Sequence, residues 1–345
     1  MGELPIPTTW EDLDADWFGT LFETTVLSVT DGGPTGGIAV TSRVARLRLT
    51  AEPEGSAPTS VVAKVANPQW QAGTELYGRE VSFYRDFVGS TELPVPVCFH
   101  ADWDPESGAF VLILEDLGDV EPGHRLDGLT LAEAEAVADG IADLHRSFWE
   151  SERLRLFPRR GHEAPRIAKS VESLPTRLQT IRQQGRYSIS DRLTSVIPKV
   201  LEHYPDGMLR ISRTPQTLIH SDLHVENFFL KASRDGFRLI IIDWQNPCFG
   251  NVAFDVAQVL SSMRPALSRE TRVQVVKRYH ERLGIAALDL NDLQTDVAAA
   301  IRHQFVGSAN WYATFEAQSL RDSRTMQGHW TRLVAALLAI ENADE

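Results

Sequence analysis

The hydrophobic period of the chain changes once, near residue 118, and this change constrains the fold more than any other feature. Between Leu27 and Leu114, runs rich in β-branched residues, such as VARLRLT at 44–50 and SVVAKVA at 60–66, predict strands separated by turns. After Gly118, apolar residues recur at three- and four-residue steps, which predicts helices. We therefore expect a β-rich N-terminal lobe, residues 1–117, and a mainly helical C-terminal lobe, residues 118–345.

Each half also contains a segment of the other kind. The run TELYGREVSFYRDFV at 74–88 has an apolar face at helical spacing, so it predicts a helix within the strand-rich half. In the helical half, FRLIIIDW at 237–244 is an apolar run typical of a strand. Thr130 and Glu133 form a capping-box signature that predicts where the first helix after the change of period begins.

Composition and charge exclude several classes of protein. The 345 residues carry a formal net charge of −13, which argues against binding to nucleic acid or to an anionic membrane surface. Only Cys98 and Cys248 are present, so a disulfide framework and a zinc ribbon are not supported. The N-terminus lacks the pattern of a signal peptide, and no apolar run is long enough to span a membrane. A cytoplasmic enzyme is expected, and its oligomeric state is left open.

The segment HSDLHVEN at 220–227 concentrates chemically active side chains and has two functional explanations. On an extended backbone the alternating His220, Asp222 and His224 would point to one side, which could form part of a hydrolytic zinc site. Such a site needs further ligands, and the other histidines form no second cluster. Ordinary hydrogen bonding in a loop would also account for His220 and His224 without a metal.

Phosphoryl transfer explains the same segment and more of the chain. Asp222 and Asn227 have the spacing of an H-x-D-x-x-x-x-N catalytic loop, in which the Asp meets an acceptor hydroxyl and the Asn binds Mg²⁺. Asp243 ends the strand-like run that follows. Because Mg²⁺ prefers a few hard oxygen ligands together with phosphate and water, Asn227 and Asp243 are a sufficient protein set.

The N-terminal half supplies residues that could hold a nucleotide. Lys64 lies in the middle of a predicted strand and Glu80 on the helix that follows, which is the arrangement of a pair that positions phosphates. A solvent-facing lysine is the alternative explanation. The glycine-rich DGGPTGG at 31–37 could cover phosphates with backbone N–H groups, although a plain loop has similar composition. The strand FVLILEDLG ends at Glu115 to Leu117, a connector whose backbone could bind adenine.

Taken together, these motifs resemble those of one family. HSDLHVEN is similar to the HGDLHPGN-type loop, and IIDWQ with its downstream Gly and Asp to the IDWE or IDWQ segment, of the aminoglycoside phosphotransferase and choline kinase-like family. REVSFYRDF, VLILEDLG and LHRSFW are most similar to its ecdysteroid kinase-like branch. The resemblance covers roughly residues 30 to 260. It implies a bilobal α+β protein-kinase-like fold and ATP- and Mg²⁺-dependent transfer of a γ-phosphate to a hydroxyl group.

The resemblance also implies roles for individual residues. They are Asp222 as catalytic base with His220 bracing its loop, Asn227 and Asp243 as Mg²⁺ ligands, Lys64 and Glu80 as the phosphate clamp, Glu115 and Leu117 as the connector that contacts adenine, and Asp255 as a support of the catalytic loop. Asp255 has an alternative explanation as an ordinary carboxylate at a helix N-terminus. A nucleotide-binding pseudokinase without turnover is the rival function, and the presence of every expected catalytic side chain argues against it.

Two departures from related patterns bear on the acceptor. Ser221 occupies the position where this family usually has Gly and protein kinases have Arg. The 11 residues between Asp243 and Asp255 are too few for a peptide-binding activation segment, so a small-molecule acceptor of aminoglycoside, amino alcohol, sugar, sterol or macrolide type is expected. Candidate acceptor contacts are His303, Gln304, Trp311, Tyr312 and Glu316, although such residues at helical spacing more often serve packing than a pocket.

Overall fold

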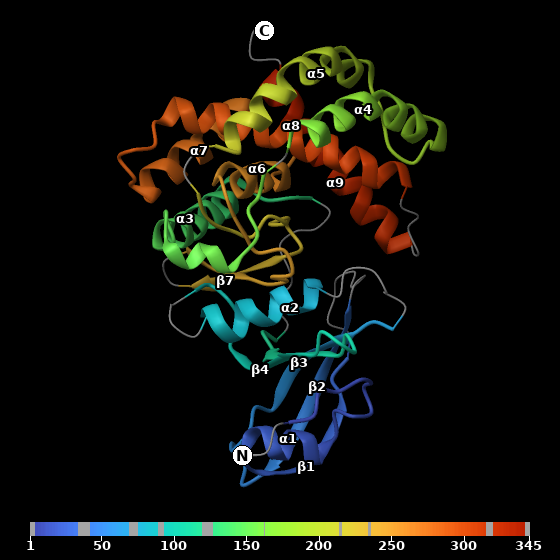
Figure 1. The fold of residues 1–345 in the computed structure, drawn as a ribbon, viewed down its shortest axis with the longest axis vertical. Helices are drawn as coiled ribbons and strands as arrows, with labels where there is room; N and C mark the ends of the chain where they lie inside the picture. The colour runs from blue at the N-terminus through green and yellow to red at the C-terminus, as the bar shows by residue number, and fades with distance from the viewer. Residues whose placement is uncertain are drawn as a thin grey trace. The chain divides into compact units, whose positions relative to one another are not determined.

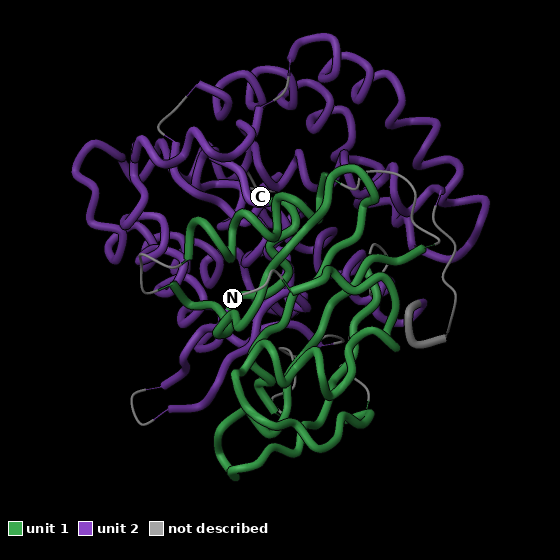
Figure 2. Tube along the Cα trace, turned by 60° about the horizontal axis from the view of Figure 1, so that its bottom comes forward, with its two compact units in different colours: residues 1–120, 241–246 green, residues 121–240, 247–345 purple. Residues whose placement is uncertain are grey.

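The computed structural model describes most of the chain and divides it into two compact units. The described residues are 4–33, 42–68, 75–88, 93–118, 127–161, 163–213, 216–233, 236–314 and 320–341. The first unit contains residues 1–120 with 241–246, and the second contains residues 121–240 with 247–345 (Figure 2). The division into two lobes after Leu117, which the sequence predicts, stays a prediction. No helix in the described ranges has the length and apolar character needed to cross a membrane.

The first unit is built on a five-stranded antiparallel sheet of order β1-β2-β3-β5-β4 (Figure 1). Its strands are β1 (Thr25–Asp31), β2 (Ser42–Glu52), β3 (Ser60–Ala66), β4 (Cys98–Trp103) and β5 (Phe110–Glu115). Successive side chains of a strand point to opposite faces, so Val61, Ala63 and Val65 of β3 enter a core with helix α1 (Ala15–Phe22). Lys64 therefore projects from the opposite face of the sheet.

The helix predicted over 74–88 is confirmed, with one difference in its last turn. Helix α2 spans Glu75–Ser82 and continues as a π-helical segment, Phe83–Phe87, in which the N–H of Val88 donates to the carbonyl of Phe83. The wider turn buries three aromatic side chains, those of Phe83, Tyr84 and Phe87. Apolar spacing alone does not distinguish this widened turn from an α-helix.

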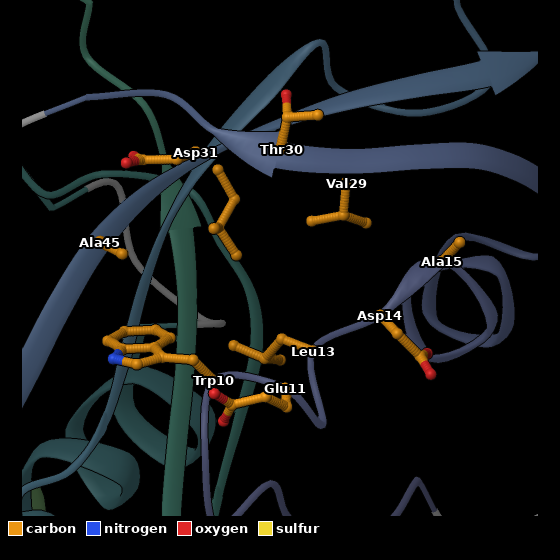
Figure 3. Close-up of a pocket in the computed structure, with 10 residues that line it drawn as sticks. Trp10, Glu11, Leu13, Asp14, Ala15, Val29, Thr30, Asp31 and Ala45 are labelled. Atoms are coloured by element: carbon orange, nitrogen blue, oxygen red, sulfur yellow. The ribbon is translucent and has the colours of Figure 1, made fainter.

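A hollow with a volume of about 630 Å³ lies between the N-terminal segment and the outer strands of the same unit (Figure 3). Its lining residues are Trp10, Glu11, Leu13, Asp14, Ala15, Val29, Thr30, Asp31, Ala45 and Leu47. None of the site residues predicted from the sequence lines this hollow. The glycine-rich segment at 31–37 falls mostly outside the described residues, because 34–41 are not described.

The second unit is mainly helical. Its helices are α3 (Leu131–Ser147), the 3₁₀ turn η3 (Glu152–Leu156), α4 (Ala164–Gln184), α5 (Asp191–Ile211), α6 (Ala253–Ser262), α7 (Arg269–Leu283), α8 (Leu290–Thr314) and α9 (Leu320–Glu341). The predicted capping box is confirmed: Thr130 caps α3 by accepting from the N–H of Glu133, whose carboxylate accepts from the N–H of Thr130. Strand-rich and helix-rich parts thus follow each other as the change of period predicts, and the fold is a mixed α+β fold.

Two short antiparallel pairs of strands frame the predicted catalytic loop in the second unit. β6 (Thr217–Ile219) pairs with β9 (Cys248–Gly250), and β7 (Phe228–Ser233) pairs with β8 (Gly236–Ile241). The loop at 220–227 therefore leaves the end of β6 and enters β7. Both of its ends are anchored by buried apolar residues, among them Ile219 and Phe228.

Candidate active site

Lys64 and Glu80 form a buried ion pair in the first unit. The Lys64 Nζ donates to both carboxylate oxygens of Glu80, at 2.7 and 2.8 Å, and to Oδ1 of Asp243 at 2.8 Å. The pairing removes the solvent-facing explanation for Lys64, since this side chain is buried and Glu80 is fully buried. The sequence placed these two residues as partners, and the structure brings both of them together with Asp243.

Burial and neighbouring charges determine the protonation states of Lys64 and Glu80. Burial by itself would lower the pKa of the Lys64 ammonium, but the carboxylates of Asp243 and Glu80 outweigh burial and raise it above its usual value. Burial also raises the pKa of Glu80, to about 7, although Lys64 acts to lower it. Lys64 is therefore held as a cation, with its three hydrogens directed at three carboxylate oxygens.

Asp243 is presented on a constrained turn. Its φ of 64° lies in the left-handed region, which Asp tolerates better than most residues. The next residue, Trp244, is fully buried and stacks on Phe83, with ring centroids 4.0 Å apart and planes 10° apart. Gln245 hydrogen-bonds Glu80. The residues that follow Asp243 thus anchor its turn to the helix that carries Glu80, and they leave the Asp243 side chain 36% exposed.

The connector at Glu115 to Leu117 is held in place by neighbouring strands. The backbone N–H of Glu115 donates to the carbonyl of Val97 at 2.8 Å, and its carboxylate accepts from the N–H of Val97. Arg46 binds the next residues, through Asp116 and the carbonyl of Gly118. Because the N–H of Glu115 is already paired, a base bound here would contact its carbonyl or the half-buried Leu117.

In the second unit, Asp255 of α6 organises the loop that carries Asp222. The buried carboxylate of Asp255 accepts from the backbone N–H groups of His220 and Ser221, both at 2.8 Å. Burial would raise the pKa of Asp255, but the hydrogen bond from His145 and the charges nearby outweigh burial and keep it below the usual value. Asp255 is therefore an ionised acceptor fixed beneath the loop.

His145 is a participant that the sequence did not identify. Its Nε2 lies 3.3 Å from Asp255, its Nδ1 lies 2.7 Å from the hydroxyl of Tyr279, and its carbonyl accepts from the hydroxyl of Thr217 at 2.7 Å. An ionised carboxylate only accepts, so Nε2 is the donor to Asp255. His145 belongs to the LHRSFW motif. That motif suggested a family, but a single sequence contains no signal that links it to Asp255.

The loop itself is folded by internal hydrogen bonds. Ser221 has a φ of 67°, a conformation that Gly adopts more easily, which is consistent with the Gly usual at this position in related motifs. The N–H of Asp222 donates to Nδ1 of the buried His220, and the carbonyl of Asp222 accepts from Nδ2 of Asn227 at 2.8 Å. Asp222 remains 46% exposed at the side chain. The loop therefore presents a carboxylate to solvent while fixing the backbone behind it.

The backbone geometry rules out the alternating metal site. Residues 220–226 form no strand, and the left-handed turn at Ser221 breaks the alternation that would align His220, Asp222 and His224. Among the described residues, the group at metal-binding separations contains neither His220 nor Asp222. The alternative of a zinc site made from these three side chains is therefore not supported, because it required an extended backbone.

The candidate acceptor contacts are mostly accounted for by packing. His303 stacks on Tyr204 and hydrogen-bonds its hydroxyl, and Gln304 binds the side chains of Ser261 and Gln258. Tyr312 is buried, whereas Trp311 is 43% exposed. Glu316 lies outside the described residues. The structure therefore leaves the acceptor contacts unassigned.

Solved structures with the same fold are phosphotransferases. Spectinomycin phosphotransferase APH(9)-Ia, in complex with ADP and spectinomycin, aligns with a TM-score of 0.60 at 12% identity, over 95% of this chain and 97% of its own. The GDP complex of aminoglycoside 2′-phosphotransferase-IIIa aligns with a TM-score of 0.55 at 14% identity, over 95% of this chain and 96% of its own. At these identities the likeness establishes the fold.

A family model establishes the relationship at the level of sequence. No curated protein matches the chain significantly. The model of the ecdysteroid kinase-like family matches residues 39–291, which is more than half of the chain. It includes the Lys64 pair, the Asp222 loop and Asp255, and it agrees with the branch that the sequence motifs indicated. The chain belongs to the ecdysteroid kinase-like family.

Proposed function

We propose that the chain is a small-molecule kinase that transfers the γ-phosphate of ATP to a hydroxyl group of its acceptor. The observation that carries this proposal is the buried Lys64 ammonium, which is held by Glu80 and Asp243 at 2.7–2.8 Å. A lysine that served only stability would be better replaced by an apolar side chain, because burying ions costs about as much as their attraction returns. A cation kept in this position is suited to bind phosphate.

Two further residues complete the chemistry in this proposal. Asp222 orients the acceptor hydroxyl and accepts its proton, since its carboxylate is accessible while its backbone is fixed. His220 and Asp255 act behind it and hold the loop in the geometry required. Positioning and fixed charges would then supply most of the rate enhancement.

The residues proposed to bind Mg²⁺ suit that ion. Asn227 directs its amide hydrogens at the carbonyl of Asp222 and at Nε2 of His224, so its amide oxygen is the atom left for a cation. Asp243 offers a partly exposed carboxylate. Both are hard oxygen ligands, the kind that Mg²⁺ selects, and the bound ion would neutralise charge on the β- and γ-phosphates.

The acceptor is proposed only as a class. The net charge of −13 favours a cationic acceptor such as an aminoglycoside or an amino alcohol. One structure with the same fold holds spectinomycin, and another, with a TM-score of 0.54, holds kanamycin. A screen should therefore begin with aminoglycosides and amino alcohols, and then extend to sugars, sterols and macrolides.

The test separates nucleotide binding from turnover. Thermal denaturation is measured with Mg²⁺–ATP, with Mg²⁺–GTP and with Mg²⁺ alone, because a ligand of the native state raises the melting temperature. Wild type should respond to Mg²⁺–nucleotide, whereas Asp243→Ala should respond much less. Release of ADP in the presence of the acceptor panel then reports phosphoryl transfer.

Asp222→Asn tests the catalytic step itself. This variant should keep the thermal response to nucleotide and lose roughly 10²- to 10⁴-fold in transfer rate, the usual contribution of a general base. Asp206→Asn, which changes an exposed carboxylate on α5, is the matched control and should behave as wild type. The proposal fails if wild type shows no nucleotide response, or if Asp222→Asn transfers phosphate at the wild-type rate.

A further inference from the structure

A second group of potential metal ligands lies beside the proposed Mg²⁺ ligand Asn227, whose Nδ2 is 3.2 Å from Nε2 of His224. His224 and Glu226 come from the loop at 220–227, and His329 comes from α9, the helix drawn in red in Figure 1. One ligand atom from each of the three residues lies within 4.8 Å of the others. The Nε2 of His329 lies 3.9 Å from Oε2 of Glu226, and the two imidazole rings lie 5.1 Å apart between centroids.

The separation of His329 Nε2 from Glu226 Oε2 is close to that of two ligand atoms in a zinc site. Bond lengths of about 2.0–2.2 Å and tetrahedral angles place two ligand atoms roughly 3.3 Å apart. The observed 3.9 Å between His329 and Glu226 therefore has to shorten by only about half an ångström.

His329 has an unused nitrogen directed at the group. Its Nε2 is buried and has no hydrogen-bond partner within the part of the chain that the structure describes. An unpaired buried polar atom destabilises the folded chain, and a bound cation would offset that cost.

His224 can exchange an existing contact for a metal. Its Nδ1 lies 3.3 Å from the N–H of Glu226, and its Nε2 lies 3.2 Å from Nδ2 of Asn227. Both contacts are long, so each contributes little to stability, and replacing one of them by a bond to a metal ion is a small cost.

We propose that His224, Glu226 and His329 form a binding site for a borderline divalent cation such as Zn²⁺. Two imidazoles and one carboxylate are a ligand set that Zn²⁺ accepts, whereas Mg²⁺ prefers oxygen ligands only. The site leaves a fourth position for water. The site connects α9 to the loop that carries Asp222, because His329 belongs to α9 and the other two ligands belong to the loop. The Nε2 of His224 lies 3.9 Å from Oδ1 of Asp222.

Arg332 is the competing cation. Its guanidinium is buried and lies near Glu226, so the positive charge of Arg332 opposes a second cation at this carboxylate. Burial lowers the pKa of Arg332 to about 10, which leaves it charged at neutral pH. Bonds from two imidazoles to Zn²⁺ have to outweigh this repulsion. The titration below shows whether Zn²⁺ binds beside Arg332.

The test is a metal titration without nucleotide or acceptor, so it is independent of kinase activity. Tag-free, chelator-treated protein is titrated with Zn²⁺ against a fluorescent chelator, and with Co²⁺ while its visible absorption is recorded. We expect one Zn²⁺ per chain and a tetrahedral Co²⁺ spectrum, with no displacement by millimolar Mg²⁺. His329→Gln should weaken Zn²⁺ binding by at least about tenfold, since loss of even a supporting partner costs about 10–100-fold.

The control is His203→Gln, which removes an exposed histidine on α5 and should leave affinity unchanged. Glu226→Gln provides a second test if His329→Gln does not fold, as judged by thermal denaturation of the metal-free proteins. Absence of saturable Zn²⁺ binding by wild type would overturn the proposal. Equal affinity in wild type and in folded variants of the site would also overturn it.

Discussion

Removing the Lys64 ammonium should make the stability of the protein depend on pH in a new range. The replacement Lys64→Met keeps the length of the side chain but leaves the fully buried carboxyl of Glu80 without its cation. Breaking a buried pair in this way costs about 3–5 kcal/mol while the remaining group stays charged. Glu80 limits this loss by binding a proton, because burial already raises its pKa to about 7.

The direction of this pH dependence, and the pH range in which it occurs, follow from the pKa of Glu80. Its folded-state value lies above the ordinary value of 4.5, so its contribution to stability is present at low pH and is lost as pH rises through the folded-state pKa. In wild type this loss is nearly complete slightly above pH 7. Lys64 lowers the pKa of Glu80, so Lys64→Met moves the folded-state value higher, to the range of about 8–9 known for buried Glu.

The Lys64→Met variant should therefore continue to lose unfolding free energy as the pH rises above 7, a range in which wild type loses little. At about 1.4 kcal/mol per pH unit, Lys64→Met loses about 2 kcal/mol of unfolding free energy between pH 7 and pH 8.5. At about 2.1 cal/mol/K of unfolding entropy per residue, this corresponds to a fall of about 3 °C in the melting temperature of the 345-residue chain, measured by thermal denaturation at the two pH values.

The double variant Lys64→Met/Glu80→Gln is the control. It has no titrating carboxyl at position 80, so its melting temperature should follow the same pH dependence as wild type. An unchanged pH dependence in Lys64→Met would refute the reasoning. The same steep dependence in the double variant would assign the effect to another group.

Two further predictions concern the loop that carries Asp222. Asp255→Asn replaces one acceptor oxygen opposite the N–H groups of His220 and Ser221 by an amide donor, and should cost about 1–3 kcal/mol in unfolding free energy, measured by denaturant titration. The folded-state pKa of Asp255 lies below 3.8, so this carboxylate stabilises wild type above about pH 4, and the difference from the variant should shrink on acidification below that value. Ser221→Gly should leave the melting temperature nearly unchanged, because relief of about 1 kcal/mol of left-handed strain offsets the greater freedom of Gly in the unfolded chain. Ser221→Val should be clearly destabilising, and equal melting temperatures for the Val and Gly variants would contradict the assigned strain.

Local patterns in the sequence predicted several strands and helices of the two units. The β-branched runs at 44–50 and 60–66 lie in β2 and β3, and the capping box at Thr130 marks the start of α3. These signals are local, since strand alternation and helix capping depend on residues close together in the chain. The π-helical turn at Phe83–Phe87 was not predicted, because burial of its aromatic rings depends on distant partners such as Trp244.

The sequence by itself determined which residues are proposed to carry the chemistry, because the Asp222–Asn227 spacing and the types of Lys64, Glu80 and Asp243 form a recognisable pattern. Only the tertiary structure decided their partners. The link from His145 to Asp255 and the approach of His329 to His224 and Glu226 join positions more than one hundred residues apart. Hydrogen bonds and metal ligation depend on distances of a few ångströms, and such distances between remote segments are fixed by packing, which no local pattern records.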